Sequence, residues 1–417
     1  MPENFHIDMP EAVRNIIHTI EEHGFKAYAV GGCIRDSILG RNPDDWDITT
    51  SAVPSQIKTF FKRTVDTGIA HGTVTIMIDK TGYEVTTYRI DGEYEDGRHP
   101  KFVEFSDRLV DDLCRRDFTI NAMAYNDTDG FVDEFKGLDD LDTKIIRCVG
   151  EPELRFTEDA LRMMRAIRFS AQLGFTIDEA TWNAIKKLSP SISKISMERV
   201  HVELGKTLMS AHPDYVAQYS EAGLFAPILP VIDNALKSRY KRKILATLQH
   251  TPDNIYLRYA ALFITSTPDE AAKTLRALKL DNKTVNTVSK LVELSKMDIE
   301  ETEPAVRTAL NKYGRDFLPL WHELMMAVIQ ASEDITGISN PAKVKHLLTL
   351  KRLGTDILAR GDCFTIKDLD ISGNDLIEYG LQGHEIGETL KSLLDIVIEN
   401  PKLNDKATLI AMIEHIK

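Results

Sequence analysis

The segment YAVGGCIRDSILG at residues 28–40, followed by DWDIT at residues 45–49, decides how the N-terminal part of this chain folds. An apolar strand that runs into Gly31 and Gly32 and then into a helical pattern predicts a strand–turn–helix unit. Glycines before a helix N-terminus let a phosphate approach the free backbone N–H groups, and Arg35 would add a bidentate contact. The alternative is a tight turn without a ligand, which a lone Gly-Gly pair more often is.

A pair of carboxylates follows this unit. Asp45 and Asp47 lie two residues apart at the opening of the next expected strand, so we expect both side chains on one face. Adjacent like charges are costly unless a cation lies between them, and Mg²⁺ prefers hard oxygen ligands. Glu84, on a later alternating strand, is a candidate third metal carboxylate. An isolated Asp-x-Asp is more often a solvated loop, and Glu84 is equally well an exposed strand residue.

The composition describes an ordinary globular chain of several domains. It has 417 residues, of which 43% are hydrophobic and 28% charged, and no apolar run is long enough to cross a bilayer. The N-terminus has no secretion signal, and the four cysteines are far apart in the sequence. We therefore expect a cytoplasmic protein with no membrane association and no cysteine zinc site.

The net charge of −13 limits how the chain contacts nucleic acid. Non-specific affinity for nucleic acid comes from Lys and Arg side chains that neutralise phosphates. We therefore expect any RNA contact to be confined to local basic patches. The charge by itself slightly favours a metabolic enzyme.

Helix and strand signals are mixed up to residue 150, and almost everything after that residue has helical apolar spacing. An opening helix buries Val13, Ile16, Ile17 and Ile20 and stops at Gly24. Strands are expected at AYAV, WDITT, TVTIMI and YEVTTYRI, and a hairpin at Asp127–Gly130. Breaks in the pattern predict domains at residues 1–150, 151–210, 211–310 and 311–417.

Two later segments carry charges on apolar helical stripes. In DDLCRRDFTINAMAYN, residues 111–126, Arg116 and Asp117 form either an internal ion pair or the wall of a nucleotide pocket. In FTEDALRMMRAIRFSAQLGF, residues 156–175, we expect Thr157 to cap a helix that carries Asp159 and Arg162 one turn apart. Such a pair offers an acceptor beside a donor, which suits the edge of cytosine or adenine. A solvated, salt-bridged face is the alternative.

Taken together, these motifs resemble the class II tRNA nucleotidyltransferase and bacterial poly(A) polymerase family, of the polymerase-β-type superfamily. The resemblance rests on motifs that occur in the family order: GGCIRD with DDWDIT, RRDFTINAMAY, FVDEFKGLDDLDTKIIRCVG and EDALRMMRAIRF. A later ISKISMERVHVELGKTL is similar to the motif that braces the neck. The resemblance implies an α+β fold. A nucleotidyltransferase head with a mixed sheet would precede an all-helical neck, body and tail.

Three features resemble the CCA-adding branch of that family, without an HD phosphohydrolase domain. DTGIAHGTVTIMI at residues 66–78 is similar to a motif of those enzymes, and YRIDGEYEDGRHPKFVEF at residues 88–105 is similar to the flexible loop needed to add the terminal A. In addition, the sequence contains no His-Asp pair of the HD type. The implied activity is addition of C, C and A to the 3′ end of tRNA from CTP and ATP. A poly(A) polymerase, an enzyme that adds only A, and a catalytically silent tRNA-binding protein are the alternatives.

The resemblance also implies roles for single residues and for partners. Two Mg²⁺ ions would be held by Asp45 and Asp47, with Glu84 as a catalytic candidate. The implied nucleotide-binding residues are Gly32, Arg35, Arg116, Asp159, Arg162, Arg165 and Arg168. We expect tRNA to be bound by its acceptor end and its outer corner, and the resemblance also allows a homodimer. The tail segment at residues 371–394 and a basic cluster of residues 237–243 are the candidate surfaces for tRNA.

Overall fold

The computed structural model describes residues 6–92 and 102–416, which form two compact units. The first unit is Met1–Pro230 and the second is Val231–Lys417. The four-part division expected from the sequence is finer than this and stays a prediction. Its boundary after residue 310 falls inside helix α16 (Glu303–Tyr313).

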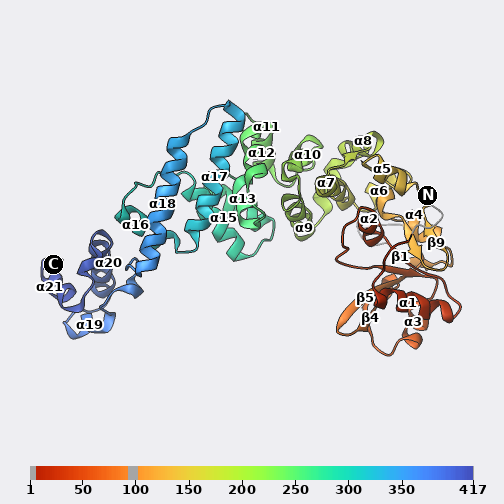
Figure 1. The fold of residues 1–417 in the computed structure, drawn as a ribbon, viewed down its shortest axis with the longest axis horizontal. Helices are drawn as coiled ribbons and strands as arrows, with labels where there is room; N and C mark the ends of the chain where they lie inside the picture. The colour runs from red at the N-terminus through yellow and green to blue at the C-terminus, as the bar shows by residue number, and fades with distance from the viewer. Residues whose placement is uncertain (1–5, 93–101, 417) are drawn as a thin grey trace. The chain divides into compact units, whose positions relative to one another are not determined.

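A seven-stranded mixed sheet is the centre of the first unit (Figure 1). Its strand order is β3-β4-β5-β2-β1-β8-β9. Pairing is antiparallel except between β2 and β5, which run parallel. The strands are β1 (Ala27–Val30), β2 (Ile48–Thr50), β3 (Thr64–Gly68), β4 (Thr73–Ile78), β5 (Thr81–Thr87), β8 (Ala124–Asn126) and β9 (Gly130–Val132). The expected strands at residues 27–30 and 73–78 and the β8–β9 hairpin are thus confirmed. The strand expected at residues 83–90 is divided between β5 and β6, and the strand expected at residues 46–50 begins only at Ile48.

The first unit also contains two smaller sheets of two strands each. Strands β6 (Arg89–Asp91) and β7 (Val103–Phe105) pair antiparallel, and β10 (Ile145–Ile146) pairs parallel with β11 (Thr176–Ile177). The segment that is similar to the family's flexible loop includes β6 and β7. Its central residues, 93–101, lie outside the described part of the chain.

Helices cover both faces of the large sheet. Helices α1 and α3 pack against each other and against β1, β2 and β4, whereas α4 brings Leu113 into a core with Tyr28 and Val30 of β1. All four residues of β1 are buried as a result. The helices of this region are α1 (Glu11–Glu22), α2 (Gly32–Ile38), α3 (Pro54–Phe60), η1 (Ile69–His71), α4 (Leu109–Cys114), η2 (Thr119–Asn121) and α5 (Gly137–Asp142).

The opening helix follows the expected pattern. Val13, Ile16, Ile17 and Ile20 of α1 are buried, because residues three and four apart share one face of a helix. The chain then turns at Gly24, whose φ of 86° suits a residue without a side chain.

Helices make up nearly all of the remainder of the first unit, as the sequence predicts. They are α6 (Pro152–Glu158), α7 (Leu161–Leu173), α8 (Glu179–Leu188), η3 (Ser189–Lys194), α9 (Met197–Leu208), η4 (Pro213–Val216) and α10 (Ala217–Glu221). Helices α7 and α9 pack against each other, and α6 packs on α8.

In the described part of the second unit, the regular secondary-structure elements are all helices. Its helices, counted from Pro230 onward, are α11 (Pro230–Lys237), α12 (Lys241–His250), α13 (Ile255–Leu262), α14 (Pro268–Ala277), α15 (Asn282–Leu294), α16 (Glu303–Tyr313), α17 (Phe317–Thr336), α18 (Pro341–Arg360), η5 (Ile366–Asp368), α19 (Gly373–Glu378), α20 (His384–Glu399), η6 (Pro401–Leu403) and α21 (Lys406–Ile416).

Local caps explain where several of these helices start. Thr267 and Glu270 form a reciprocal capping box at α14, and Ser372 and Asp375 form another at α19. The last helices have a core of their own around Leu376, which is fully buried. Within residues 6–92 and 102–416, no helix has the length and apolar character that crossing a membrane requires.

Candidate active site

The Gly31–Gly32 turn joins β1 to α2 as the sequence predicts. Gly31 has a φ of 87°, and a β-carbon there would lie 3.0 Å from Nη1 of Arg116. The backbone N–H of Gly31 donates to the carbonyl of Met123 at 3.1 Å, which fixes the turn against the strand β8. A side chain at this position would be strained by both the backbone angle and the close guanidinium.

Asp45 and Asp47 lie just before the strand β2 rather than inside it, because regular pairing begins at Ile48. The backbone N–H of Val30 donates to the carbonyl oxygen of Asp47 at 3.0 Å. This bond anchors the carboxylate segment to the end of β1, next to the glycine turn. The expected strand assignment is therefore wrong by a few residues, whereas the expected closeness to Gly31 is found.

A cavity of about 500 Å³ lies beside these elements. Among the residues proposed from the sequence, it collects Gly32, Arg35, Asp45, Asp47 and Arg168. The full lining is Gly32, Cys33, Arg35, Asp36, Arg41, Asn42, Pro43, Asp44, Asp45, Asp47, Arg168, Gln172, Leu173, Met209, Ser210 and Ala211. The other sequence candidates, Glu84, Arg116, Asp159, Arg162 and Arg165, do not line this cavity.

The charge environment of Asp47 is unfavourable for an isolated carboxylate. Partial burial raises the pKa of the Asp47 carboxyl; the positive charge of Arg116 opposes this rise, and the negative charge of Asp45 adds to it. The net direction is upward. A nearby cation would therefore stabilise the ionised form.

Glu84 lies on β5, beside β2 in the sheet. In the parallel pairing of β2 with β5, Ile48 lies opposite Val85. Asp47 and Glu84, which each precede one of these residues, are therefore at the same level along the two segments. Its side chain is exposed. Across the described residues, no three acidic, histidine or cysteine side chains are grouped closely enough to bind a metal ion.

Arg35 is held in place by two partners. Its Nη1 donates to Oδ1 of Asn121 at 2.6 Å, and its Nε and Nη2 donate to the two carboxylate oxygens of Asp36 at 3.0 and 2.7 Å. The side chain is largely buried, at 10% exposure. Arg35 therefore presents a fixed guanidinium at the wall of the cavity.

The segment around Arg116 and Asp117 is not one continuous helix, which corrects the expected helical stripe. Helix α4 ends at Cys114, and only the short turn η2 (Thr119–Asn121) follows. Nor do the two charges pair with each other. Asp112 accepts from Arg115 at 2.7 Å and from Arg116 at 3.1 Å. Asp117 instead accepts from Arg165 at 2.6 Å.

One nitrogen of Arg116 has an unusual environment. Among the described residues, its Nε is buried and has no hydrogen-bond partner. A buried donor of this kind is costly unless something occupies the space beside it. Nη1 of the same side chain lies beside the glycine turn, 3.0 Å from where a β-carbon of Gly31 would stand.

The helix that carries Arg162, α7, begins at Leu161, so Asp159 lies just before it and not inside the expected helix. Thr157 lies within α6 and does not cap α7. The carboxylate of Asp159 takes the capping role instead, because its Oδ1 accepts from the backbone N–H of Leu161 at 3.0 Å. Asp159 therefore stands at the junction of α6 and α7, where its orientation is fixed by tertiary contacts.

Asp159 and Arg162 are engaged by different partners and not by each other. Asp159 Oδ2 accepts from Arg199 at 2.7 Å. Arg162 pairs with Glu158 and donates to the carbonyl of Arg115 at 3.0 Å. Both functional groups are thus held rigidly, with side chains that are 16% and 12% exposed.

The remaining arginines of α7 surround one aromatic ring. The guanidinium carbons of Arg35, Arg165 and Arg168 lie 5.1, 5.3 and 3.8 Å from the centre of the Phe169 ring. Arg168 is also paired with Glu203 and donates to Gln172 at 2.7 Å. Cation–π contacts and ion pairs therefore organise these charges on one side of the cavity.

Several residues that organise this region were not among the site residues proposed from the sequence. They are Asp112, Asn121, Glu158, Arg199 and Glu203. Two of them, Arg199 and Glu203, lie in the segment that is similar to the family's neck-bracing motif. That motif was the available signal, but local spacing does not reveal which arginine or carboxylate a residue will meet.

The buried Asp117–Arg165 pair predicts a specific acid sensitivity. Burial alone would raise the pKa of Asp117, but the charge of Arg165 and the hydrogen bond from Asn121 outweigh it, and the pKa lies well below its usual value. A carboxyl whose pKa is lowered on folding stabilises the fold above pH ~4, and this contribution is lost as pH falls further. We expect Asp117→Asn to lower the free energy of unfolding at pH 7 by about 3 kcal/mol and to flatten its decline below pH ~4.

Chemical denaturation between pH 3 and 7 measures both effects. Asp142→Asn is the matched control, because Asp142 is an exposed carboxylate outside this network. Equal pH slopes for the wild type and Asp117→Asn would show that Asp117 does not carry this dependence.

Comparison with known proteins agrees with this geometry. Residues 27–147 match the family model described as the poly A polymerase head domain. Residues 174–236 match a model for an RNA and SrmB-binding site of polymerase A, and residues 256–413 match tRNA nucleotidyltransferase domain 2. The matched ranges together span most of the chain.

Relatives that align over nearly their whole length are named CCA-adding enzymes. The CCA-adding enzyme of Pediococcus pentosaceus is 34% identical over 98% of both chains. That of Limosilactobacillus fermentum is 37% identical over 96% of this chain and 95% of its own. A solved structure of the Bacillus stearothermophilus CCA-adding enzyme in complex with CTP is 32% identical, with a TM-score of 0.75 over 97% of this chain and 96% of that one. This chain belongs to the family of CCA-adding enzymes, the tRNA nucleotidyltransferases that have a polymerase-β-type head.

Proposed function

We propose that Asp45 and Asp47 hold the Mg²⁺ ions with which this chain adds C, C and A to the 3′ end of tRNA, using CTP and ATP and releasing pyrophosphate. The observation that carries this proposal is the meeting of the Gly31–Gly32 turn and the two carboxylates at one cavity. A phosphate-accepting turn beside a metal-binding pair is what transfer of a nucleotide needs. The full-length relatives supply the identity of the acceptor.

The carboxylates fit a divalent cation. The pKa of Asp47 is raised through partial burial, and Asp45 raises it further, so a cation beside the pair would relieve an existing cost. Two protein carboxylates with substrate phosphates form a common type of Mg²⁺ site. Magnesium held there would make the tRNA 3′-hydroxyl more acidic and neutralise charge on the leaving pyrophosphate. We propose Glu84 as a further carboxylate because it is level with Asp47 in the sheet.

Three residues are suited to hold the triphosphate and ribose. Gly32 opens α2 at the cavity, and Arg35 has a guanidinium already oriented by Asp36 and Asn121. Arg116 has a buried Nε without a partner among the described residues, close to the glycine turn. A ribose hydroxyl or phosphate oxygen placed there would satisfy this donor.

Selection of the base is assigned to Asp159 and Arg162. A carboxylate accepts a hydrogen bond from the amino group of cytosine or adenine, whereas a guanidinium donates to the adjacent ring nitrogen. Arg199 and Glu158 hold the two side chains in fixed orientations. Arg165 and Arg168 lie around the Phe169 ring, where their pairs with Asp117 and Glu203 hold the guanidinium groups in place.

We assign tRNA binding beyond the acceptor end to the second unit. Not every residue of the basic cluster, 237–243, is free for RNA, because Lys237 pairs with Asp233 at 2.8 Å and Arg239 packs over Tyr240. The tail offers Gly380 and Gly383, with φ values of 104° and 60°, in turns beside α20. A homodimer and a cytoplasmic location complete the proposal; the described thiols, which are all free, suit a reducing compartment.

The decisive experiment uses tRNA transcripts that end before, within and after the two cytidines. With CTP and ATP together, all three should be completed to CCA, and with CTP alone the first should gain C residues only. The description of the head model favours one rival, a poly(A) polymerase, which would add a run of A to each transcript and leave CTP unused. An enzyme that adds only A would extend only the transcript that already ends in CC.

A further inference from the structure

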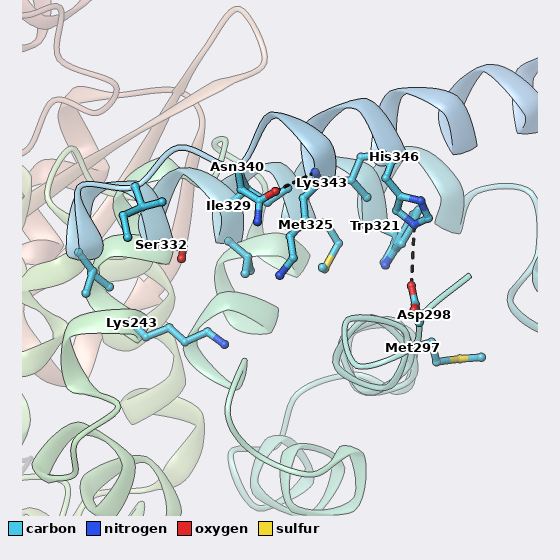
Figure 2. Close-up of a pocket in the computed structure, with 14 residues that line it drawn as sticks. Lys243, Met297, Asp298, Trp321, Met325, Ile329, Ser332, Asn340, Lys343 and His346 are labelled. Atoms are coloured by element: carbon cyan, nitrogen blue, oxygen red, sulfur yellow. Dashed lines mark hydrogen bonds and ion pairs between the residues drawn. The ribbon is translucent and has the colours of Figure 1, made fainter. Parts of the chain in front are cut away.

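A second cavity lies within the second unit and takes no part in the proposed nucleotide chemistry (Figure 2). Its volume is about 580 Å³, and it lies between helices α12, α17 and α18. The lining residues come from these helices and from the segment after α15. They are Lys243, Met297, Asp298, Trp321, Met325, Val328, Ile329, Ser332, Ile335, Ile338, Asn340, Lys343, His346 and Leu347.

The wall of this cavity is mostly apolar. Among the lining residues, Trp321 and Leu347 are buried, whereas Ile338 is 72% exposed. Met325 and Ile329 of α17 add flexible and branched apolar surface. Small-molecule sites typically have volumes of about 300–1,000 Å³ and an apolar wall with a few polar groups. This cavity fits that description in both size and chemistry.

Two exposed lysines supply the ammonium groups of the lining. Figure 2 shows Lys243 of α12 and Lys343 of α18 extending toward the space between their helices. Within the described chain, neither ammonium group has a carboxylate within ion-pair distance. Asp298, the one acidic residue in the lining, lies 3.9 Å from His346. The lining therefore has uncompensated positive charge above an apolar base.

The positions of these lysines in their helices strengthen the argument. Each lies in the first turn of its helix, and neither first turn contains an acidic residue. Cations near a helix N-terminus are disfavoured by the helix dipole. Two such placements around one cavity leave a local positive potential that an anion would neutralise.

We propose that this cavity binds a small amphiphilic anion, which has one acidic head group and an apolar body of roughly the length of a medium-chain fatty acid. The head group would lie between Lys243 and Lys343, and the body would cover Trp321, Met325 and Ile329. A stretch of RNA backbone suits this surface poorly, because it is polar throughout and would leave the apolar wall exposed. We therefore assign Lys243 to this cavity rather than to the RNA-facing part of the basic cluster.

Decanoate is a suitable probe, titrated into the full-length protein by calorimetry and followed by the fluorescence of Trp321. Trp46 and Trp182 lie outside the cavity, so Trp46→Phe with Trp182→Phe isolates the signal of Trp321. We expect binding with one-to-one stoichiometry. Decanol, which has the tail without the charge, should bind at least about tenfold more weakly, and acetate should not bind measurably.

Variants then separate charge from shape. Lys243→Met and Lys343→Met keep an apolar stem and remove the ammonium group, and each should weaken decanoate binding about tenfold. Lys345→Met is the matched control, because Lys345 lies on the same helix as Lys343 but outside the lining, and its affinity should be unchanged. Ser332→Phe should fill the cavity and abolish binding of decanoate and decanol together.

Three results would overturn the proposal: equal affinities for decanoate and decanol, no effect of either lysine variant, or binding that survives Ser332→Phe. Affinity for tRNA is measured in parallel. If the lysine variants lost affinity for tRNA while keeping that for decanoate, the two lysines would belong to an RNA surface instead. CCA addition by the wild type is assayed separately, without decanoate, so that a failure of decanoate binding and a failure of the proposed transferase function are distinguishable.

Discussion

Asp47→Asn and Asp45→Asn are each expected to reduce nucleotide transfer by at least about 10³-fold, because the amide cannot replace a charged metal ligand. Affinity for tRNA should be unchanged or slightly higher, since each substitution removes one negative charge from a chain of net charge −13. The measurements are single-turnover transfer with CTP and tRNA binding in the absence of nucleotide. Asp44→Asn is the matched control, because Asp44 lines the same cavity but lies outside the Asp45–Asp47 pair.

A second readout does not depend on activity. The raised pKa of Asp47 means that ionisation of this carboxyl is less favourable in the folded protein than in the unfolded chain, so the charge costs stability at neutral pH. Asp47→Asn should therefore leave Tm unchanged or slightly higher in metal-free buffer. The wild type should gain stability on addition of Mg²⁺, whereas Asp47→Asn should gain much less. Equal Mg²⁺-dependent shifts in both proteins would remove Asp47 from the metal site.

The second large effect concerns the choice of nucleotide. We expect Asp159→Ala to weaken discrimination of CTP and ATP against UTP and GTP by about 1–3 kcal/mol, because uracil and guanine present a carbonyl that a carboxylate repels. Transfer itself should persist, since Asp159 does not line the cavity that contains Asp45 and Asp47. The measurement is kcat/KM for all four nucleotides.

The neighbours of Asp159 make this test sharper. Its carboxylate is held by Arg199 and also caps α7, so the alternative role is structural. That role predicts a loss of about 1 kcal/mol of stability with unchanged selectivity. Arg199→Ala should also relax selection, because it frees the carboxylate to turn. Glu198→Ala, an exposed neighbour on α9, should do neither.

Much of the first unit could be predicted from local pattern. The strands β1 and β8 and the glycine turn follow from apolar runs, β-branched residues and glycine, which act over a few residues. The start of α7 could be predicted only to within a few residues, at Thr157 instead of Leu161, because no glycine or proline marks the junction with α6. Asp159 at this junction is held by Arg199, a residue 40 positions away.

The same reason explains the two corrected charge pairs. Arg116 and Asp117 are adjacent in sequence, and local spacing therefore suggests a pair. In the structure Asp117 meets Arg165, which is 48 residues away, and Arg116 meets Asp112. Ion-pair partners that are far apart in the sequence are brought together by the packing of helices. The apolar periodicity of one segment does not predict them.

The arginines that surround Phe169 have one further consequence. Arg35, Arg165 and Arg168 already have carboxylate partners in Asp36, Asp117 and Glu203. Under the proposed function, an arriving triphosphate would therefore exchange these carboxylate oxygens for phosphate oxygens instead of neutralising bare charge. These ion pairs leave little net charge around Phe169. Abundant cellular polyanions would therefore gain little by binding there. Under the proposed function, a nucleotide would compete successfully only by also supplying a base and a metal-bound phosphate, which would make occupancy of the region selective for the complete substrate.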